Sequence, residues 1–400
     1  MPTSNVGMTT HAASTYLPKP KEERDGIGLC LSGGGYRAAL FHLGAVRRLN
    51  ELGILAKLKT ISSVSGGSIV SAHLAARLPW PLTGPVPDWE SRVAAPFRRF
   101  TSTNIRTPAL VASLLPWKTG AGVLAGQYGK RLTGLKLADL PDTPRFVFCA
   151  TDLAFGTNWV FEKDRIGDYE AGHGSPPPEY AVALAAGASS CFPPVFKPLR
   201  LHLDPARLTG GSFPRGPERD ERIRGLALSD GGVYDNLGLE PVWKDHAVVL
   251  SSDGGALFGT SADTGFVWEV KHYLAIPENQ ALAVRKRWLM ANFLSGIMEG
   301  TYWGIGGAAT SYGGSAGYSK ELASGVIAAI RTDLDSFSDA EAAVLENHGY
   351  ILADAAVRRH VPALLPAAVP PLAVPHPDWM DEDRVRATLK DSGHRSRLGR

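Results

Sequence analysis

Short apolar runs alternate with amphipathic stretches near the start of this 400-residue chain, and glycine clusters lie between them. The first pair is a strand-like run over 25–31 and a helix-like stretch over 37–52, in which leucine and valine recur along one side. A second pair covers 58–64 and 69–78. Strands that alternate with helices form a parallel or mixed sheet with helices packed on its faces. We therefore predict an α/β fold of three layers, in which a central, mostly parallel sheet lies between helices.

Ser65 lies at the junction of the second pair, directly after the apolar run and directly before two glycines. Small residues after a serine allow a sharp turn from a strand into a helix, and the helix dipole favours negative charge on the exposed oxygen. This setting is typical of a nucleophilic serine. Ser62, Ser63 and Ser68 are competing hydroxyls, but none of them is followed immediately by a pair of glycines. A serine before glycines is more often only a helix N-cap, so Ser65 alone does not decide the function.

Two other glycine-rich turns also follow apolar runs. Gly33, Gly34 and Gly35 come after the first run, and three backbone N–H groups free of side chains can turn inward to form an oxyanion hole. Such glycines also cradle nucleotide phosphates, but no Gly-Lys-Ser or Gly-Lys-Thr follows them. Asp230 ends a run over 226–229 and precedes two more glycines. A carboxylate at the end of a strand reaches the crevice where other strands end, so the three turns together predict a hydrolase site.

The three turns resemble those of the patatin-like phospholipase family, which includes the catalytic domain of cytosolic phospholipase A. The matching segments stand in the order of the family and are Ser32-Gly-Gly-Gly-Tyr-Arg37, Ser63-Val-Ser-Gly-Gly67 and Asp230-Gly-Gly232. The likeness extends through 150–156 and 188–196 and covers roughly residues 25–255. It implies a patatin-like fold with Ser65 as the nucleophile, Asp230 as its partner base, Gly33, Gly34 and Gly35 as oxyanion donors, and Arg37 near a substrate phosphate.

Two features of the chain depart from the family pattern. Most members carry glycine two residues before the nucleophile, whereas this chain carries Ser63, whose Cβ would crowd a tight turn. Asp253 is a second aspartate that follows an apolar run and precedes two glycines. We favour Asp230 as the base, because only its sequence continues toward Pro241 as the family does, and we interpret Asp253 as a turn residue at a strand end.

The predicted site works without histidine. A serine hydroxyl is a weak nucleophile until a neighbouring base removes its proton, and histidine is the usual base. The eleven histidines are scattered along the chain, and none of them lies in a recognisable catalytic motif. We therefore predict a pair made of Ser65 and Asp230. Because a carboxylate is the weaker base, it requires partial burial, and the glycine N–H groups must supply much of the rate enhancement.

The predicted reaction is the hydrolysis of a fatty acyl ester through an acyl-enzyme formed on Ser65, as in a phospholipase A or a lysophospholipase. It requires neither a metal nor an organic cofactor. Two alternatives stay open. One is a general serine carboxylesterase or a peptidase of the α/β-hydrolase type, which needs a histidine. The other is a signal-gated effector with low basal activity that attacks membranes when a ligand or an assembly orders its site.

Composition indicates a protein with a large core and no nucleic-acid partner. The chain is 44% hydrophobic and 20% charged, with a net charge of only +3. Cys30, Cys149 and Cys191 are odd in number and stand among apolar or small residues, which indicates buried thiols in a reducing compartment. No signal peptide and no run of eighteen apolar residues is evident. We expect a cytoplasmic protein that visits the membrane surface as a peripheral enzyme and finds a phospholipid or lysolipid there.

The predicted organisation has three parts. Residues 1–24 form a polar N-terminal tail, 25–360 form the hydrolase domain, and 361–400 form a proline-rich connector and a basic C-terminal tail. Within the domain, the segment 79–129 is rich in Trp, Pro and Gly, and we interpret it as an inserted cap over the site.

The C-terminal third carries three helix patterns and one stretch without a pattern. Helices are expected over 340–347, which a capping box opens, over 350–359, and over the basic and aromatic stretch 278–298. The last of these either packs on the core or lies on an anionic membrane. The glycine-rich stretch 300–317 is expected to lack regular structure.

Overall fold

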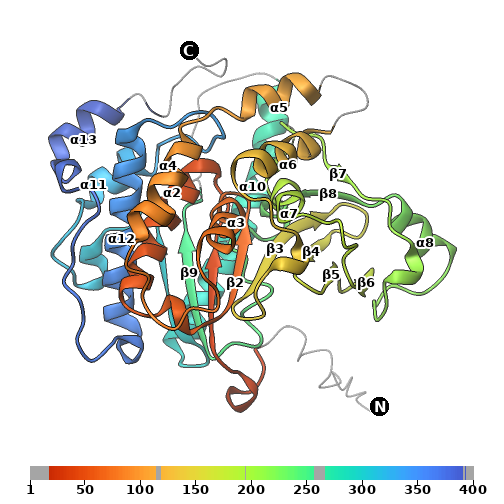
Figure 1. Ribbon diagram of the computed structural model, residues 1–400, viewed down its shortest axis with the longest axis horizontal. Helices are drawn as coiled ribbons and strands as arrows, with labels where there is room; N and C mark the ends of the chain where they lie inside the picture. Colours follow the sequence, from red (N-terminus) through yellow and green to blue (C-terminus); the bar gives the residue numbers. More distant parts are fainter. Residues whose placement is uncertain (1–17, 114–118, 194, 256–265, 391, 393–400) are drawn as a thin grey trace, which may run out of the picture.

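A computed structural model describes residues 18–113, 119–193, 195–255, 266–390 and 392. Its centre is a ten-stranded sheet in the order β10-β9-β1-β2-β3-β4-β5-β6, with β8 paired to β3 and β7 paired to β8. Helices cover both faces of this sheet (Figure 1). The predicted three-layer α/β fold with a mostly parallel central sheet is therefore confirmed.

Five neighbouring strands form the parallel centre of the sheet. They are β10 (Glu299–Gly304), β9 (Val248–Asp253), β1 (Ile27–Leu31), β2 (Leu58–Val64) and β3 (Arg145–Asp152). The antiparallel part consists of β4 (Thr157–Phe161), β5 (Ile166–Asp168), β6 (Gly172–Gly174), β7 (Leu199–Arg200) and β8 (Ala227–Asp230). Because parallel strands end at one edge of a sheet, the turns after β1, β2 and β9 lie at the same edge.

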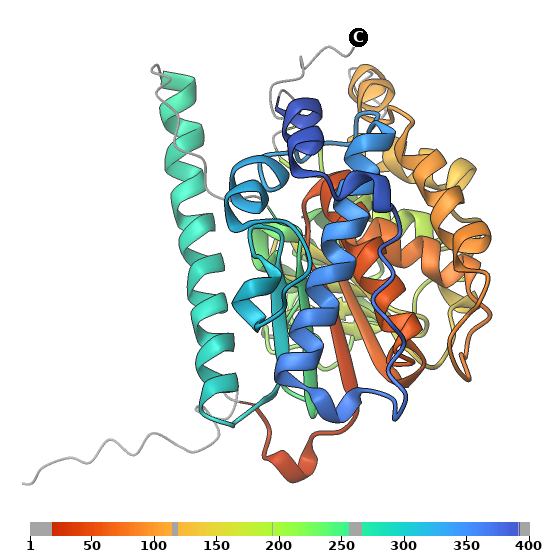
Figure 2. The ribbon, with the colours of Figure 1, turned by 90° about the vertical axis from the view of Figure 1, so that its left-hand side faces the viewer.

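Alternate residues of β1 belong to two layers of the core. Leu29 and Leu31 lie in the larger hydrophobic cluster, and Cys30 lies in a second cluster with Leu289 of α10 (Phe266–Leu294). Every residue of β1 is buried, as expected for a strand that is covered on both faces. Figure 2 shows α10 on one side of the sheet and α12 on the other. The helices of the larger cluster include α2 (Gly35–Glu51), α3 (Gly66–Arg77) and α12 (Asp339–His360).

Helices α2 and α12 pack against each other at glycine contacts. A Cβ on Gly44 would stand 1.9 Å from the Glu346 carbonyl oxygen, and one on Gly349 would stand 1.9 Å from that of Phe41. The capping box of Ser338 and Glu341 opens α12 as predicted. The two helices expected over 340–347 and 350–359 are wrong as separate elements, because Gly349 permits close packing without ending the helix.

The segment 79–129 lies between α3 and β3 and is largely helical. Its elements are η3 (Glu90–Ala94), α4 (Ala95–Thr101), α5 (Arg106–Ser113) and α6 (Gly120–Arg131). Phe97, Leu124 and Tyr128 are fully buried in the larger cluster, so these helices are part of the core. A cap function for the segment stays a prediction. The remaining short helices are α7 (Val182–Ser189), α8 (Pro217–Arg224), α9 (Gly232–Asp235), α11 (Lys320–Leu322) and α13 (Glu382–Leu389).

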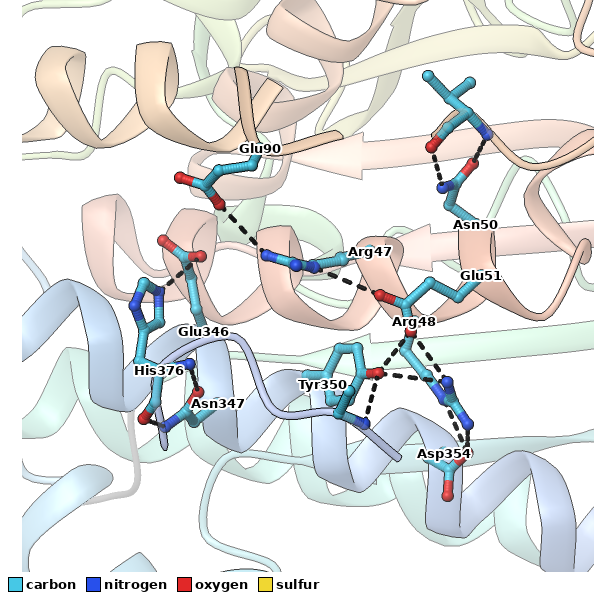
Figure 3. A network of polar contacts seen from close by, with 12 residues as sticks. Arg47, Arg48, Asn50, Glu51, Glu90, Glu346, Asn347, Tyr350, Asp354 and His376 are labelled. Carbon is cyan, nitrogen blue, oxygen red and sulfur yellow. Dashed lines mark hydrogen bonds and ion pairs between the residues drawn. The ribbon is translucent and has the colours of Figure 1, made fainter. Parts of the chain in front are cut away.

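Residues 361–390, for which the sequence predicts a connector and the start of a tail, pack on the domain. The side chain of Arg48 in α2 is fully buried, and its guanidinium donates to the carbonyl oxygens of Pro370 at 2.8 Å and Pro371 at 3.1 Å. Figure 3 shows how Arg48 is surrounded by polar groups of α2 and α12. In α13, Val385 and Leu389 are 0% and 3% exposed. The basic tail beyond residue 392 lies outside the described residues.

The N-terminal tail predicted over 1–24 is described from residue 18 onward. There η1 (Lys21–Glu23) leads to Arg24, whose Nη2 donates to the Ile297 carbonyl oxygen at 2.5 Å. The contact fastens this end of the chain to the loop after α10.

Two expectations for the C-terminal third are settled by packing. Trp288 and Leu289 of α10 lie in the second cluster, so this helix packs on the core. Residues 300–304 form most of β10, where a Cβ on Gly300 would stand 2.0 Å from the Val249 carbonyl oxygen. The expected lack of regular structure is wrong there, because the glycine permits close contact between strands. Among the described residues, no helix combines the length and the apolar character that crossing a bilayer requires.

Candidate active site

Ser65 lies at a strained turn between β2 and α3. Its φ of 49° and ψ of −113° make it the one non-glycine residue with positive φ among the described residues. Such conformations cost on the order of 1–3 kcal/mol and persist where the surroundings enforce them. A Cβ on Gly66 would stand 2.2 Å from the Gly35 carbonyl oxygen, and one on Gly67 would stand 2.2 Å from that of Leu31. The turn therefore requires both glycines after the serine.

The competing serines are directed into the protein. Ser62, Ser63 and Ser68 are 0% exposed, whereas Ser65 is 9% exposed. Ser63 Oγ donates to the Val147 carbonyl oxygen at 3.2 Å, so the side chain of Ser63 is directed away from the turn. The crowding that we expected from a serine in place of the family's glycine is therefore avoided. Among the described residues, no hydrogen bond is found for Ser65 Oγ. Of these four hydroxyls, that of Ser65 is the one available to a substrate.

The glycine loop after β1 packs directly on the serine turn. A Cβ on Gly33 would stand 3.1 Å from Ser65 Cβ. The N–H of Gly33 donates to the Asn236 carbonyl oxygen at 3.0 Å. For the N–H groups of Gly34 and Gly35, no acceptor is found within the described part of the chain. Both groups lie at the N-terminus of α2, where the helix dipole adds positive potential, and they are the available donors of the loop.

Strand β3 brings Asp230 and Ser65 together. One edge of β3 pairs with β4, and the other edge pairs first with β2 and then with β8. On this second edge, Val64 at the end of β2 lies beside Cys149, and Asp230 at the end of β8 lies beside Ala150. The two strands therefore end against each other. The turn that carries Ser65 begins at the point where Asp230 stands.

The surroundings of the Asp230 carboxylate fix its position. The residue is 2% exposed, and Oδ1 accepts a hydrogen bond from the Gly232 N–H at 2.8 Å. Its backbone carbonyl accepts one from the Thr151 hydroxyl at 2.8 Å. A Cβ on Gly231 would stand 2.4 Å from the Cys149 carbonyl oxygen, so the turn after Asp230 also requires a glycine.

Asn236 is a residue of this site that the sequence did not single out. Its Oδ1 lies 2.3 Å from the point where a Gly33 Cβ would stand, and 2.7 Å from the corresponding point of Gly232. Asp230 Oδ1 lies 3.0 Å from the latter point. The carboxamide thus stands between the glycine loop and the aspartate, and within the described part of the chain no hydrogen bond of its side chain is found. The signal was its place after Asp230, but only the fold brings it to the loop.

Asp253, the second candidate base, is occupied by other partners. Its Oδ2 accepts a hydrogen bond from the Tyr302 hydroxyl at 2.6 Å and pairs with Lys286 Nζ at 2.5 Å, and its Oδ1 accepts one from the Gly255 N–H at 2.9 Å. Burial alone would raise the pKa of Asp253, but Lys286 and these hydrogen bonds hold it below its usual value. A carboxylate held in this way is a poor base.

Arg37 lies behind the glycine loop. It is 2% exposed, and its guanidinium donates to three backbone carbonyl oxygens. The acceptors are those of Gly254, Ala328 and Ile330, at 3.0, 2.7 and 2.8 Å. This position links the loop to the C-terminal third and gives no support to the predicted contact with a substrate phosphate.

No histidine is hydrogen-bonded to Ser65 among the described residues. His42 lies beside the glycine loop, where Nε2 is 3.0 Å from the Ser32 carbonyl oxygen and Nδ1 is 2.8 Å from Ser252 Oγ. Burial lowers the pKa of His42 to about 4, so this imidazole is neutral at physiological pH. Its role is to hold the loop.

The fold and these turns define a class of α/β proteins in which a serine, a glycine loop and an aspartate meet at one edge of the sheet. The family model described as patatin-like phospholipase matches residues 29–243, more than half of the chain. The chain belongs to the patatin-like phospholipase family. No curated protein sequence matches it.

The chain is similar to solved structures of two proteins, a human phospholipase and a bacterial protein. The human GIVD cytosolic phospholipase A2 in complex with methyl gamma-linolenyl fluorophosphonate has a TM-score of 0.44 and 14% identity, over 93% of this chain and 60% of that chain. Another structure of the human enzyme has a TM-score of 0.38 and 14% identity, over 58% of this chain and 46% of that one. VipD from Legionella pneumophila has a TM-score of 0.36 and 14% identity, over 84% and 67%. The chain thus spans about half the length of the human phospholipase.

Proposed function

We propose that this protein is a lipid acyl hydrolase of the phospholipase A or lysophospholipase type, with Ser65 as the nucleophile and Asp230 as its base. Its family is one of hydrolases that act on lipid esters. The observation that carries the proposal is the strained turn of Ser65, which packs on the glycine loop where β2 and β8 end against each other.

In the first step Ser65 Oγ attacks the carbonyl carbon of a fatty acyl ester while Asp230 takes its proton. Negative charge develops on the carbonyl oxygen in the tetrahedral intermediate. The N–H groups of Gly34 and Gly35 donate hydrogen bonds to this oxygen and stabilise the charge. The C–O bond to the lipid alcohol then breaks, and Asp230 returns the proton to that alcohol. The product is an ester of the fatty acid with Ser65.

In the second step a water molecule attacks the acyl-enzyme. Asp230 takes a proton from the water, the same N–H groups stabilise the second intermediate, and the proton passes to Ser65 Oγ as the fatty acid leaves. The reaction uses no metal and no organic cofactor. Asn236 stands between the glycine loop and Asp230, where its free carboxamide is placed to contact the water or the ester.

An apolar rim supports a lipid substrate. Phe192 and Val195, which follow α7, are 44% and 43% exposed, and Val233 after the Asp230 turn is 44% exposed. Phe192 adjoins the site, because the carbonyl oxygen of the preceding residue, Cys191, accepts a hydrogen bond from the Asp230 N–H at 3.3 Å. Exposed apolar side chains beside a polar site favour a substrate with an acyl chain. Transient contact with a membrane surface follows from such a substrate.

We also infer the extent of the domain and its compartment. The catalytic domain predicted over 25–360 continues to residue 390, because 361–390 pack on it, with 79–129 as its cap. Cys30, Cys149 and Cys191 are free and buried, which supports a reducing compartment such as the cytoplasm.

The test is covalent labelling with a fluorophosphonate, followed by mass spectrometry and by hydrolysis assays on phospholipid vesicles and lysolipid micelles. We expect one label on Ser65, none on Ser65→Ala, and a loss of activity of at least ~1000-fold in Ser65→Ala and Asp230→Ala. Ser62→Ala and Ser68→Ala are matched controls that should still be labelled. A label on another serine, or full activity of Asp230→Ala, would overturn the assignment.

The same assays separate the two alternatives. A general carboxylesterase would hydrolyse short soluble esters with no gain on micelles, and one of the α/β-hydrolase type would lose activity in a single histidine variant. A signal-gated effector would label slowly at Ser65 and accelerate when a cell extract supplies the activator.

A further inference from the structure

We propose that Asp253 and Lys286 are positioning residues of the oxyanion loop. Their ion pair fixes the turn 253–255. This segment holds the position of Gly34, whose N–H group is one of the two available oxyanion donors. The inference rests on the proposed function, because an oxyanion loop has a task only if Ser65 is a nucleophile.

The turn 253–255 lies directly against the glycine loop. The Gly254 N–H donates to Ser32 Oγ at 2.9 Å, and the Gly254 carbonyl oxygen accepts from Arg37 Nη2 at 3.0 Å. A Cβ on Gly34 would stand 2.8 Å from that carbonyl oxygen, and a Cβ on Gly254 would stand 2.6 Å from Ala38 Cα. With so little space between the two segments, a shift of the turn moves the loop.

Three donors hold the turn through the carboxylate of Asp253. The residue is 3% exposed and accepts hydrogen bonds from the Gly255 N–H at 2.9 Å and the Tyr302 hydroxyl at 2.6 Å. Lys286 Nζ lies 2.5 Å from Oδ2 and supplies the positive charge. The Lys286 side chain is 28% exposed, and its Nζ also lies 5.7 Å from the centre of the Tyr302 ring.

Helix α10 holds the other partner of the loop as well. Arg285 Nη2 donates to the Tyr234 carbonyl oxygen at 3.3 Å, and Nη1 lies 3.7 Å from Asp235 Oδ2. The next residue is Asn236, whose carbonyl oxygen accepts the Gly33 N–H at 3.0 Å. Two consecutive basic residues of α10 therefore hold the two segments on which the glycine loop rests.

An exposed ion pair would contribute little, but this one is different because its carboxylate is buried. Without Lys286, the charge of Asp253 loses its counter-charge in a dry environment, and the turn relaxes to reach water or a proton. A misplacement of about 1 Å in catalytic geometry costs on the order of 100-fold in rate. We expect Lys286→Met to lower kcat by about 10- to 100-fold and to leave KM within about twofold.

The experiment compares Lys286→Met with Lys286→Arg, which keeps the charge, and with Arg287→Met, which removes the charge of the exposed next residue. Readouts are the rate of fluorophosphonate labelling at Ser65, kcat and KM on lysolipid micelles, and thermal unfolding. We expect slow labelling and low kcat in Lys286→Met, recovery in Lys286→Arg, and wild-type rates in Arg287→Met. Asp253→Asn keeps a hydrogen-bonding side chain while it removes the charge, and it should lower kcat as Lys286→Met does.

Several results would overturn the inference. Wild-type kcat in folded Lys286→Met would show that the pair does not position the loop. An equal loss in Arg287→Met would assign the effect to the charge of α10 toward a lipid surface. If Lys286→Met fails to fold, folded Asp253→Asn with wild-type kcat refutes the proposal. Failure of the proposed function is a separate result, because it appears as an unlabelled Ser65 in the wild-type protein.

Discussion

Asp152 and Asp168 form a buried pair of carboxyl groups whose proton should control stability between pH 4 and pH 7. Asp152 ends β3, Asp168 lies in β5, and they are 0% and 1% exposed. Each Oδ1 accepts hydrogen bonds from backbone N–H groups, whereas each Oδ2 is buried without a partner among the described residues. The charge and the hydrogen-bonding capacity of Asp168 both act on Asp152, so we expect the two carboxyl groups to share one proton.

Burial, together with the neighbouring charge of Asp168, raises the pKa of Asp152 from 3.8 to about 7. Between these values the folded state holds a proton that the unfolded state has lost. The free energy of unfolding therefore falls as the pH rises from about 4 to about 7, and it levels off above pH 7. A pKa that moves from 3.8 to about 7 corresponds to ~4 kcal/mol in total, as an order of magnitude.

The perturbation is Asp152→Asn. Its carboxamide keeps an acceptor for the Ala154 N–H and offers a permanent donor to Asp168. We expect urea unfolding to give equal stabilities for wild type and variant near pH 4, and a variant more stable by up to ~4 kcal/mol at pH 8. Asp168→Asn is the matched variant: it removes the neighbouring charge but leaves Asp152 buried, so its stability should still fall as the pH rises, by less than that of the wild type.

The difference between wild type and variant cancels the contributions of other titrating groups. Parallel stability curves from pH 4 to pH 8 would refute the shared proton. Stabilisation of the wild type by added calcium at pH 8, absent from Asp152→Asn, would show that a cation takes the place of the proton.

Three further predictions concern packing. Gly66→Ala should lower kcat by at least ~100-fold with the circular dichroism spectrum unchanged, because its Cβ would stand 2.2 Å from the Gly35 carbonyl oxygen; a variant with wild-type kcat would contradict the tight turn. Arg48→Met should lower the free energy of unfolding in urea by about 3–5 kcal/mol and expose 361–390 to protease, because the side chain of Arg48 is buried. Arg47→Met should lower it by less than about 1 kcal/mol, because the side chain of Arg47 is 20% exposed. Equal costs in both variants would show that the buried network does not hold this segment. Burial raises the pKa values of Cys149 and Cys191 to about 12, so iodoacetamide at pH 8 should alkylate them only after unfolding, and mass spectrometry of native protein should show no adduct on either.

The sequence predicts those parts of the fold that local pattern determines. The strands β1 and β2 are apolar runs that are followed by glycine-rich turns. The sequence therefore indicates where each strand ends without any knowledge of the packing. The parallel partner of β9 is different, because Gly300 and its neighbours have no strand pattern of their own. They form β10 because Gly300, which has no Cβ, allows the backbone of β9 to come close enough for pairing.

The segment 361–390 shows the same limit over a longer distance. Its prolines indicate a connector. Nothing in the local sequence reveals that the guanidinium of Arg48, more than 300 positions earlier, donates hydrogen bonds to the carbonyl oxygens of Pro370 and Pro371. Contacts of this kind depend on the packing of α2 on α12.

At the site, the turns of Ser65, Gly33 to Gly35 and Asp230 are each readable as a strand that ends in glycine. Their meeting is also foreseeable, because strand ends converge in an α/β sheet. The positions of Asn236 and Lys286 are not, because Asn236 meets Gly33 and Lys286 meets Asp253 only in the folded chain. Arg37 shows the converse, because its place in a motif predicted a ligand contact and the fold buries it instead.

Strand β3 carries a consequence for how this site withstands change elsewhere in the chain. Because Val64 and Asp230 lie beside consecutive residues of one strand, their separation is set by a single stretch of backbone. The segments between Val64 and β3, and between β3 and Asp230, can grow, shrink or exchange their helices without altering that separation. Diversity in the loops and helices around the strand is thus compatible with a constant distance between the proposed nucleophile and its proposed base.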